Sequence, residues 1–192
     1  MNNIFNILIS IILNEIIPAS KISISKGNKI FGAAILKKED LSTVVIGTNN
    51  EVINPLYHGE ISTIYEYFNL GLNKKIKPTE CIFLSTHEPC SLCLSAITWS
   101  GFDNFYYFFP YKETKDKFNI PHDLNILKEI FKLNNGNYNK TNSYWKSYSI
   151  IDEINKLNNL EKKIIKDNIN KIYKEYISIN QLKGIIFLSL FF

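Results

Sequence analysis

Two short motifs contain most of the residues in this chain that could bind a metal ion or move a proton. The chain has three histidines and three cysteines, and one histidine and two cysteines fall into the pattern His58-x-Glu60 followed by Pro89-Cys90-x-x-Cys93. A catalytic zinc ion takes three nitrogen or sulfur ligands from the protein and leaves a fourth position for water. His58, Cys90 and Cys93 would supply these ligands, and Glu60 would handle the protons of that water.

The spacing of these residues fits two helix starts that point at one metal ion. Cys90 and Cys93 are three residues apart, which places both side chains on one face of a helix. Pro89 suits the first position of a helix, and the partial positive charge of a helix start favours thiolate over thiol. His58 opens a second run, whose apolar residues recur at helical spacing at Ile61, Ile64, Tyr65 and Phe68.

A structural zinc site and a redox pair are the alternatives for a C-x-x-C motif. A structural site needs four ligands. His87 is the best candidate for the fourth, because Cys81 lies in an apolar, strand-like run where a buried, inert thiol is expected. The presence of both halves of the pattern, in this order, favours the catalytic site.

Composition predicts a single-domain protein that works in a reducing compartment. The chain has 192 residues and is 45% hydrophobic, which is enough for one full core. Three cysteines, two of them in the motif, argue against a disulfide framework and predict a cytoplasmic location. The net charge is +4, and every basic side chain is lysine. Arginine is the usual bidentate partner of phosphates and guanine edges, so its absence lowers the expectation of a tightly held polynucleotide. Heavy use of Asn, Ile and Lys is also typical of an AT-rich genome, and codon bias alone would explain the missing arginine.

The N-terminal stretch 2–17 is predicted to be a mostly buried helix. Its polar residues form one stripe at intervals of three and four, at Asn3, Asn6, Ser10 and Asn14. Pro18 is expected to end the helix. A secretory signal is the alternative, but no basic residue precedes the apolar run. The run is expected to be too short and too interrupted to span a membrane, so no membrane partner is predicted.

The remaining chain alternates strand and helix patterns. The expected strands are 29–36, 42–47, 81–85, 104–109 and 144–151, and the expected helices start at His58, Cys90 and about Leu124, the last reaching about Leu133. Alternation in the second half implies parallel strands joined by crossover helices. The small residues 32–34 on the first strand allow a close approach of a helix or, alternatively, of a substrate.

The two motifs resemble those of the cytidine deaminase superfamily of zinc-dependent nucleobase and nucleoside deaminases, and the resemblance covers roughly residues 1–150. The run 58–63 is similar to fungal cytosine deaminases, whereas the run 88–97 is similar to bacterial guanine deaminases and tRNA adenosine deaminases. The resemblance implies an α/β fold of three layers, α/β/α, with a five-stranded mixed sheet. It also implies one zinc ion per chain and, in many members, a homodimer.

Carried over residue by residue, the resemblance assigns roles to five positions. His58, Cys90 and Cys93 match the zinc ligands of the family, and Glu60 matches its catalytic proton carrier. Asn49 matches the asparagine that binds the base of the substrate. On this basis residues 1–151 are predicted to form the deaminase domain.

The C-terminal stretch has no counterpart in this resemblance. Residues 152–192 are predicted to form a helical extension added to the deaminase fold. Its helical pattern runs from Asp152 to Asn180 and suggests a helix that docks on the domain. The apolar end 185–192 is far too short to span a bilayer and receives no function.

The predicted activity is hydrolytic deamination of a nucleobase or nucleoside of the guanine, cytosine or cytidine type, with release of ammonia. Zinc would lower the pKa of its water, and Glu60 would take the proton and return it to the ring nitrogen and the leaving amine. Phe108, Phe109 and Tyr111 follow the fourth strand and would either cover the flat ring or belong to the core.

Two other functions stay open at this point. The first is a tRNA-specific adenosine deaminase, whose phosphate contacts would come from Lys112, Lys115 and Lys117, although acidic residues interrupt this cluster. The second is a non-enzymatic, zinc-stabilised interaction module, which would have no need of Glu60. A fourth protein ligand on the zinc, such as His87, would favour the module.

Overall fold

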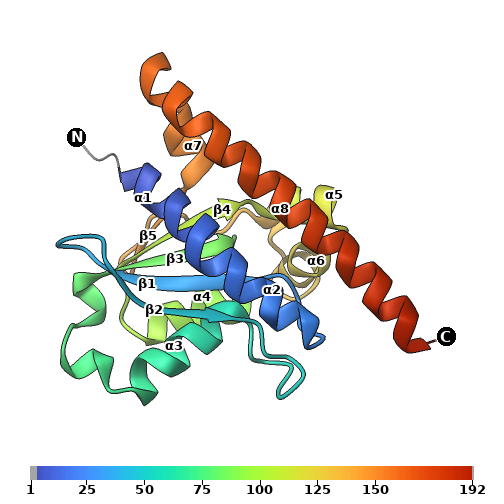
Figure 1. Cartoon of the computed structure of the whole chain (residues 1–192). Coiled ribbons are helices and arrows are strands. Elements are labelled where there is room, and N and C mark those ends of the chain that lie inside the picture. The colour runs from blue at the N-terminus through green and yellow to red at the C-terminus, as the bar shows by residue number, and fades with distance from the viewer. Residues whose placement is uncertain (1–3, 192) are drawn as a thin grey trace.

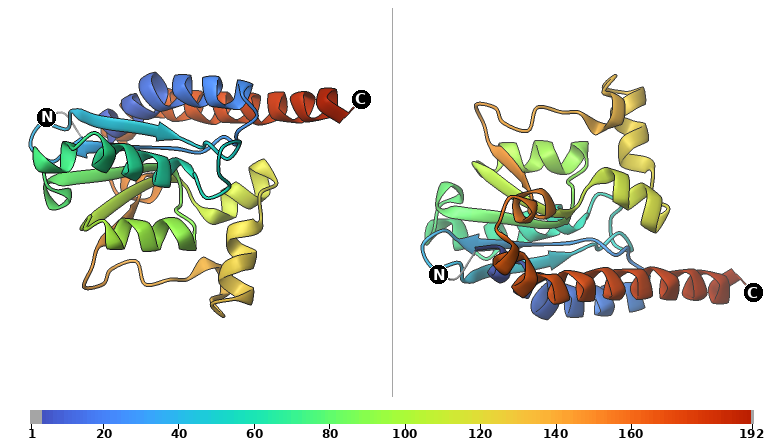
Figure 2. Two further views of the ribbon diagram at one scale, coloured as in Figure 1. Left: turned by 90° about the horizontal axis from the view of Figure 1, so that it is seen from below. Right: turned by 90° about the horizontal axis from the view of Figure 1, so that it is seen from above.

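A five-stranded mixed sheet forms the centre of the computed structural model, which describes residues 4–191 and the side chains of residues 4–181. The strand order is β2-β1-β3-β4-β5. The strands are β1 (Gly32–Lys37), β2 (Thr43–Thr48), β3 (Cys81–His87), β4 (Asn104–Phe109) and β5 (Lys146–Ser149). β1 pairs antiparallel with β2 and β3, whereas β3, β4 and β5 are parallel. Helices cover both faces of the sheet (Figures 1 and 2), so the predicted α/β/α fold is confirmed.

Alternation along the strands divides the core into two parts. Successive side chains of a strand point to opposite faces of the sheet. Ala34 and Leu36 of β1 therefore pack with the N-terminal and C-terminal helices. Ala33 and Ile35 pack on the other face, with the two helices that follow β2 and β3.

The two helices on that second face carry the motifs. α3 (Gly59–Asn69) follows β2, and α4 (Ser91–Trp99) follows β3. Two short 3-10 turns, η2 (Leu72–Lys74) and η3 (Pro78–Glu80), connect α3 to β3. Because β3 and β4 are parallel, α4 is the crossover between them, as predicted.

The N-terminal helix does not end at Pro18, and that prediction was wrong. α1 (Ile4–Ile11) passes into a π-helical stretch, η1 (Ile12–Ile16), and then into α2 (Ile17–Ser25). A proline lacks the N–H for the helical hydrogen bond, and its ring clashes with the carbonyl four residues earlier. The wider π turn lies just before Pro18, where this clash would arise, and the helix continues past it.

The continuous N-terminal helix is longer than the apolar run expected from the sequence, which bears on whether it could span a membrane. Residues Ile4–Ser25 have a mean hydropathy of 1.7 and are long and apolar enough to cross a membrane by length and composition. The expectation that this run is too short was therefore wrong. Half of it, 50%, is buried inside the fold, as in the core helix of a globular domain, although a signal sequence would pass the same test. The absence of a membrane partner stays a prediction.

Two further helices lie beyond β4. α5 (Tyr111–Phe118) was not predicted, because it is eight residues long and its exposed side chains are charged. α6 (His122–Glu129) begins near the predicted start and ends before the predicted Leu133. A 3-10 turn, η4 (Asn134–Gly136), follows it.

The C-terminal pattern forms two helices rather than the single helix expected. α7 (Ile150–Asn155) begins directly after β5, because the Ser149 hydroxyl accepts a hydrogen bond from Asp152 N at 3.2 Å. This cap shortens the strand that was predicted for residues 144–151. α8 (Asn159–Phe191) starts anew because Asn158 Oδ1 accepts hydrogen bonds from the first-turn amides Leu160 N and Glu161 N.

α8 lies alongside α1 and α2 on one face of the sheet (Figure 2). The helix therefore docks on the domain, as its pattern suggested. The side chains of the apolar end 185–192 lie outside the described residues. The division into a domain 1–151 and an extension 152–192 stays a prediction.

Candidate active site

The three predicted metal ligands converge at the starts of α3 and α4. His58 and Cys90 are the N-cap residues of these helices, and Cys93 lies in the first turn of α4. His58 Nδ1 lies 3.5 Å from Cys90 Sγ and 3.7 Å from Cys93 Sγ, and the two sulfurs are 3.6 Å apart. A tetrahedral zinc ion with usual bond lengths requires about 3.8 Å between two sulfurs and about 3.6 Å between sulfur and nitrogen. The donors thus already lie at the distances of a tetrahedral zinc site.

The charges at His58, Cys90 and Cys93, called the triad below, also favour the binding of a cation. Hydrogen bonding with Cys93 and then with His58 lowers the pKa of the Cys90 thiol to about 4, against the opposing effect of burial. Burial raises the pKa of the Cys93 thiol, and interaction with the Cys90 sulfur raises the pKa of His58. One sulfur is therefore anionic at neutral pH, and a metal cation would favour the thiolate form of the second as well.

Glu60 lies in the first turn of α3, directly beside this triad. It is 5% exposed, and its Oε2 lies 3.3 Å from Cys93 Sγ. Its Oε1 accepts a hydrogen bond from Ser85 Oγ at 2.8 Å. Burial is the largest cause of a raised pKa at the Glu60 carboxyl. The charge of the nearby Cys90 sulfur raises this pKa further. A carboxyl with a raised pKa, held beside metal donors, has the properties of a general acid and base.

A pocket of about 200 Å³ opens onto the triad. Three of its lining residues, His58, Glu60 and Cys90, come from the motifs, and Phe31 lines another part of it. α6 contributes Asp123, a residue that sequence analysis did not assign to the site. An acidic residue in the first turn of a helix is common, so its sequence position gave no distinct signal.

Asp123 has a strongly perturbed carboxyl group. Burial raises its pKa to about 7, and the charges of Cys90 and Glu60 add to this rise. A carboxyl group that titrates near neutral pH inside a pocket is a candidate for contact with a ligand.

His87 does not serve as a fourth ligand in the part of the chain that the structure describes. The donors that approach within 4.8 Å of one another there are those of His58, Cys90 and Cys93. His87 Nδ1 instead lies 3.0 Å from Thr86 Oγ1, with the ring among aromatic side chains. His87, the best candidate for a fourth ligand of a structural zinc site, therefore does not fill that place in the described residues. Cys81 is the buried thiol that was expected, with 0% of its surface exposed.

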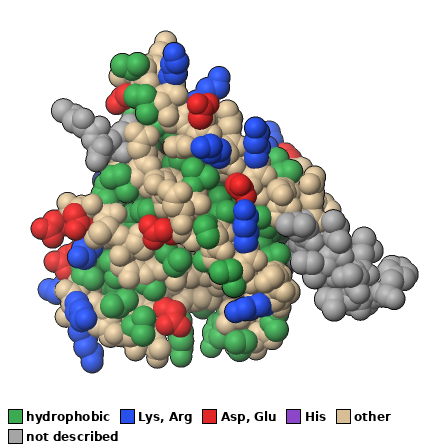
Figure 3. All heavy atoms as spheres, in the orientation of Figure 1, with side chains coloured by type: hydrophobic (Ala, Val, Ile, Leu, Met, Phe, Trp, Pro, Cys, Tyr) green, Lys and Arg blue, Asp and Glu red, His purple; other side chains and the backbone are tan. Residues whose placement is uncertain are grey.

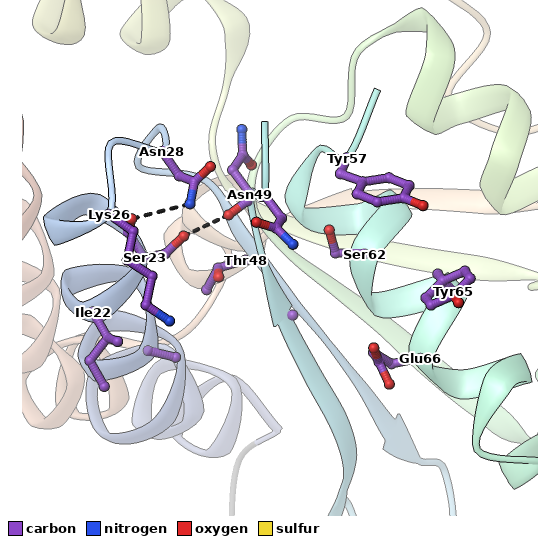
Figure 4. A pocket seen from close by; sticks show the side chains of 13 residues that line it. Ile22, Ser23, Lys26, Asn28, Thr48, Asn49, Tyr57, Ser62, Tyr65 and Glu66 are labelled. Atoms are coloured by element: carbon purple, nitrogen blue, oxygen red, sulfur yellow. Dashed lines mark hydrogen bonds between the residues drawn. The ribbon is translucent and has the colours of Figure 1, made fainter. Parts of the chain in front are cut away.

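Asn49 lies in a different hollow from the triad (Figure 4). This second hollow, of about 300 Å³, lies between α2 and α3 and includes Tyr57 and Tyr65 in its lining. Asn49 Oδ1 accepts a hydrogen bond from Gly59 N at 2.7 Å, and its main-chain oxygen accepts one from Ser23 Oγ at 2.6 Å. Asn49 thus holds the start of α3 in place, and its role in substrate binding stays a prediction.

Phe108 and Phe109, which end β4, and Tyr111, which begins α5, belong to the core. Phe108 and Phe109 are 0% exposed and Tyr111 is 4% exposed, and none of the three lines the pocket at the triad. The core interpretation of these residues is confirmed.

An ion pair that the sequence did not reveal secures the loop before Cys90. Glu88 is buried, lines the pocket, and accepts hydrogen bonds from Tyr111 N at 3.0 Å and from Lys140 Nζ. The Tyr111 hydroxyl donates to the main-chain oxygen of Pro89. Lys140 is 52 residues from Glu88 in the chain, so no local pattern could have found the pair.

Gly59 stands between His58 and Glu60, where α3 approaches β1 most closely. A Cβ atom at Gly59 would lie 2.8 Å from Gly32 Cα and 3.0 Å from Phe31 O, and both are main-chain atoms. The packing interpretation of the small residues on the first strand is therefore confirmed.

We expect Gly59→Ala to lower the free energy of unfolding by about 1–3 kcal/mol, because overpacking against main-chain atoms forces α3 to shift. Urea denaturation followed by circular dichroism would measure the change. Ser62→Ala, on the same helix but partly exposed, is the matched control. An unchanged denaturation midpoint in Gly59→Ala would contradict the expected clash.

Comparison with known families gives one match, described as the cytidine and deoxycytidylate deaminase zinc-binding region, over residues 12–109. The matched residues include both motifs. No sequence among the curated proteins matches the chain significantly.

Several solved structures are similar to this chain. Guanine deaminase from Nitrosomonas europaea is 14% identical with a TM-score of 0.52, and the match covers 85% of this chain and 81% of that one. A variant of the protein NE0047 in complex with 8-azaguanine is 14% identical with a TM-score of 0.53, covering 84% of this chain and 80% of that one. A tRNA:A34 deaminase is 18% identical with a TM-score of 0.47, covering 70% of this chain and 94% of that one. At these identities, the first two structures show a shared fold.

Proposed function

Because the chain belongs to the cytidine and deoxycytidylate deaminase zinc-binding family, we propose that it hydrolyses the exocyclic amine of a nucleobase or nucleoside and releases ammonia. The observation that carries this proposal is the convergence of the His58, Cys90 and Cys93 donors with the buried Glu60 carboxyl in one pocket. A zinc site without catalytic function would have no need of a buried carboxyl beside its ligands.

Each residue of the site has its own role in the proposed reaction. His58, Cys90 and Cys93 would hold zinc, which when bound lowers the pKa of a water ligand to about 7. Glu60 accepts a proton from the attacking water and delivers protons to the ring nitrogen and the leaving amine. Ser85 orients Glu60 through its hydrogen bond to Oε1.

The pocket favours a small, flat substrate with adjacent N–H donors. A volume of about 200 Å³ lies below the usual range of about 300–1,000 Å³ for drug-sized ligands, which suits a free base. When ionised, the Asp123 carboxylate only accepts hydrogen bonds, and guanine offers it two neighbouring donors, the ring N1–H and the 2-amino group. A protein of the same fold binds 8-azaguanine. We therefore propose guanine as the first substrate to test.

We expect the KM for guanine to fall as pH rises through about 7. Asp123 has a raised pKa of about 7, so it is protonated below that pH and becomes a full acceptor above it. Asp123→Asn should raise KM about tenfold, since a partly buried hydrogen-bond pair is lost, and should remove the pH dependence of KM. Steady-state kinetics from about one pH unit below 7 to one above would measure both effects. The same pH dependence in Asp123→Asn would show that another group binds the base.

The function itself is tested by ammonia release from the zinc-loaded protein. The panel is guanine, cytosine, adenine, their nucleosides and a tRNA anticodon stem-loop. Release from a base or nucleoside supports the proposal. Release of ammonia from the stem-loop alone would replace the proposal with tRNA editing. No release from any substrate, with zinc bound, would favour the interaction module.

Charge on the described surface gives the tRNA alternative little support. Lysine and acidic side chains are interspersed on the face seen in Figure 3. Lys117 on α5 pairs with Glu113 at 2.9 Å, so the predicted lysine cluster there is a mixed, solvated surface. A homodimer and a cytoplasmic location stay predictions.

A further inference from the structure

The C-terminal helix reaches the neighbourhood of the zinc pocket although it lies outside the residues matched by the family. α8 packs against α1, α2 and α5 (Figure 1). Its buried face consists of Ile165, Ile172, Tyr176 and Ile179, which recur at helical spacing. Tyr176 is the largest of these side chains and is 0% exposed.

The Tyr176 ring contacts residues from three elements at one end of the sheet. Its centroid lies 5.4 Å from that of His87, 5.1 Å from that of Phe109 and 6.4 Å from that of Phe118. His87 ends β3, Phe109 ends β4 and Phe118 ends α5. One side chain of α8 therefore meets the C-terminal ends of two neighbouring strands, β3 and β4.

His87 forms part of the wall of the zinc pocket. It lines the pocket together with Phe31, and the two rings meet edge to face with centroids 4.6 Å apart. Phe109, Phe118 and Tyr176 enclose the other sides of the imidazole. Burial lowers the pKa of His87 to about 3, so the ring is neutral and acts as a flat, weakly polar surface.

Only one of the two ring nitrogens of His87, Nδ1, has a hydrogen-bond partner in the described part of the chain. Its Nδ1 lies 3.0 Å from Thr86 Oγ1, which also donates to Gly32 O at 3.0 Å. Because a hydroxyl has a single proton, His87 Nδ1–H is then the donor to Thr86, and Nε2 is left as an acceptor. Within the described part of the chain, His87 Nε2 has no hydrogen-bond partner. Packing by Tyr176 and its aromatic neighbours must therefore set the orientation of the ring.

We propose that Tyr176 is a positioning residue for His87, and that the C-terminal helix thereby shapes the pocket wall against which the ring of the substrate packs. The inference rests on the proposed function, because it takes the zinc pocket as the substrate site. Tyr176 is not among the groups that line the pocket. Its loss should weaken substrate binding more than turnover.

The test compares two changes at Tyr176 with the same chemical change elsewhere on α8. Tyr176→Leu removes the ring, and Tyr176→Phe removes only the hydroxyl. Tyr173→Phe is the matched control, since it deletes a hydroxyl that bonds Glu113 at 3.1 Å on the same helix. Each variant is measured for zinc content, for kcat and KM with the active base, and for its imidazole signals by NMR. The chain has three histidines, so the His87 signals can be assigned by substitution.

We expect Tyr176→Leu to raise KM about tenfold, because a displaced pocket wall misplaces the substrate, with kcat and zinc content close to wild type. The His87 signals should shift in Tyr176→Leu, shift less in Tyr176→Phe and stay in place in Tyr173→Phe. Unchanged His87 signals and unchanged KM in zinc-loaded Tyr176→Leu would overturn the proposal. If that variant does not fold, Tyr176→Met, which also removes the ring, takes its place, and unchanged His87 signals with unchanged KM in that variant overturn the proposal.

The NMR measurement separates this inference from the proposed function. If the wild-type protein releases no ammonia from any substrate, the proposed function fails. A shift of the His87 signals in the Tyr176 variants would still support the positioning of His87 by α8.

Discussion

Glu60→Gln should leave zinc bound and lower kcat by about 100-fold to 10,000-fold, which is the range for loss of a positioned proton carrier. Glutamine keeps the shape of the side chain and its contact with Ser85, but it cannot accept and return a proton. KM should change little, since the pocket keeps its form. Steady-state ammonia release together with zinc analysis of the purified variant would measure the effect.

Glu66→Gln is the matched control for this variant, because Glu66 lies on the same helix and lines the hollow between α2 and α3 rather than the zinc pocket. It should behave as wild type. Full turnover in zinc-loaded Glu60→Gln would remove Glu60 from the mechanism. It would also favour the non-enzymatic interaction module, which does not need the Glu60 carboxyl.

Cys90→Ser should abolish zinc binding at neutral pH and, with it, all measurable activity. The low thiol pKa of about 4 makes Cys90 the sulfur that is anionic before metal binds, so its loss removes the strongest donor. The variant should also lose the thermal stabilisation that zinc gives. A ligand at a thousand times its Kd stabilises the native state by about 4 kcal/mol. For a chain of this size, each kcal/mol corresponds to about 2–4 °C in Tm.

Differential scanning calorimetry with and without a chelator would measure this stabilisation. Wild type should lose roughly 8–16 °C when zinc is removed, and Cys90→Ser should not respond to the chelator. Cys81→Ala is the control, because Cys81 is a buried thiol away from the triad whose loss should leave zinc content unchanged. A Cys90→Ser protein with one zinc ion per chain would mean that the metal sits elsewhere.

Local patterns found the zinc site because its chemistry is local. Helix geometry brings Cys90 and Cys93 together from a spacing of three, and the N-cap residues His58 and Cys90 mark where the two helices start. Glu60 is two residues from His58, so both must lie near one another in any fold. The same reasoning located all five strands, because alternating apolar residues and turn residues are also read over short distances.

Long-range contacts could not be predicted in this way. The partner of Glu88 is Lys140, from a loop whose sequence looks like ordinary surface. Asp123 enters the pocket because α6 contacts α4 in the fold, whereas in the sequence it resembles any acid in a first helical turn. Asn49 matched a family position, yet in the fold its side chain is directed toward Gly59 N at the start of α3.

The sequence by itself determined the metal, its three ligands, the five strands and the two helices that carry the motifs, because these depend on residue types at short, regular spacing. Only the tertiary structure decided what surrounds the metal. It placed Asp123 in the pocket, carried the N-terminal helix past Pro18, and brought Tyr176 of the C-terminal helix against His87. Each of these depends on burial and close packing between segments far apart in the chain, for which no local pattern carries a signal.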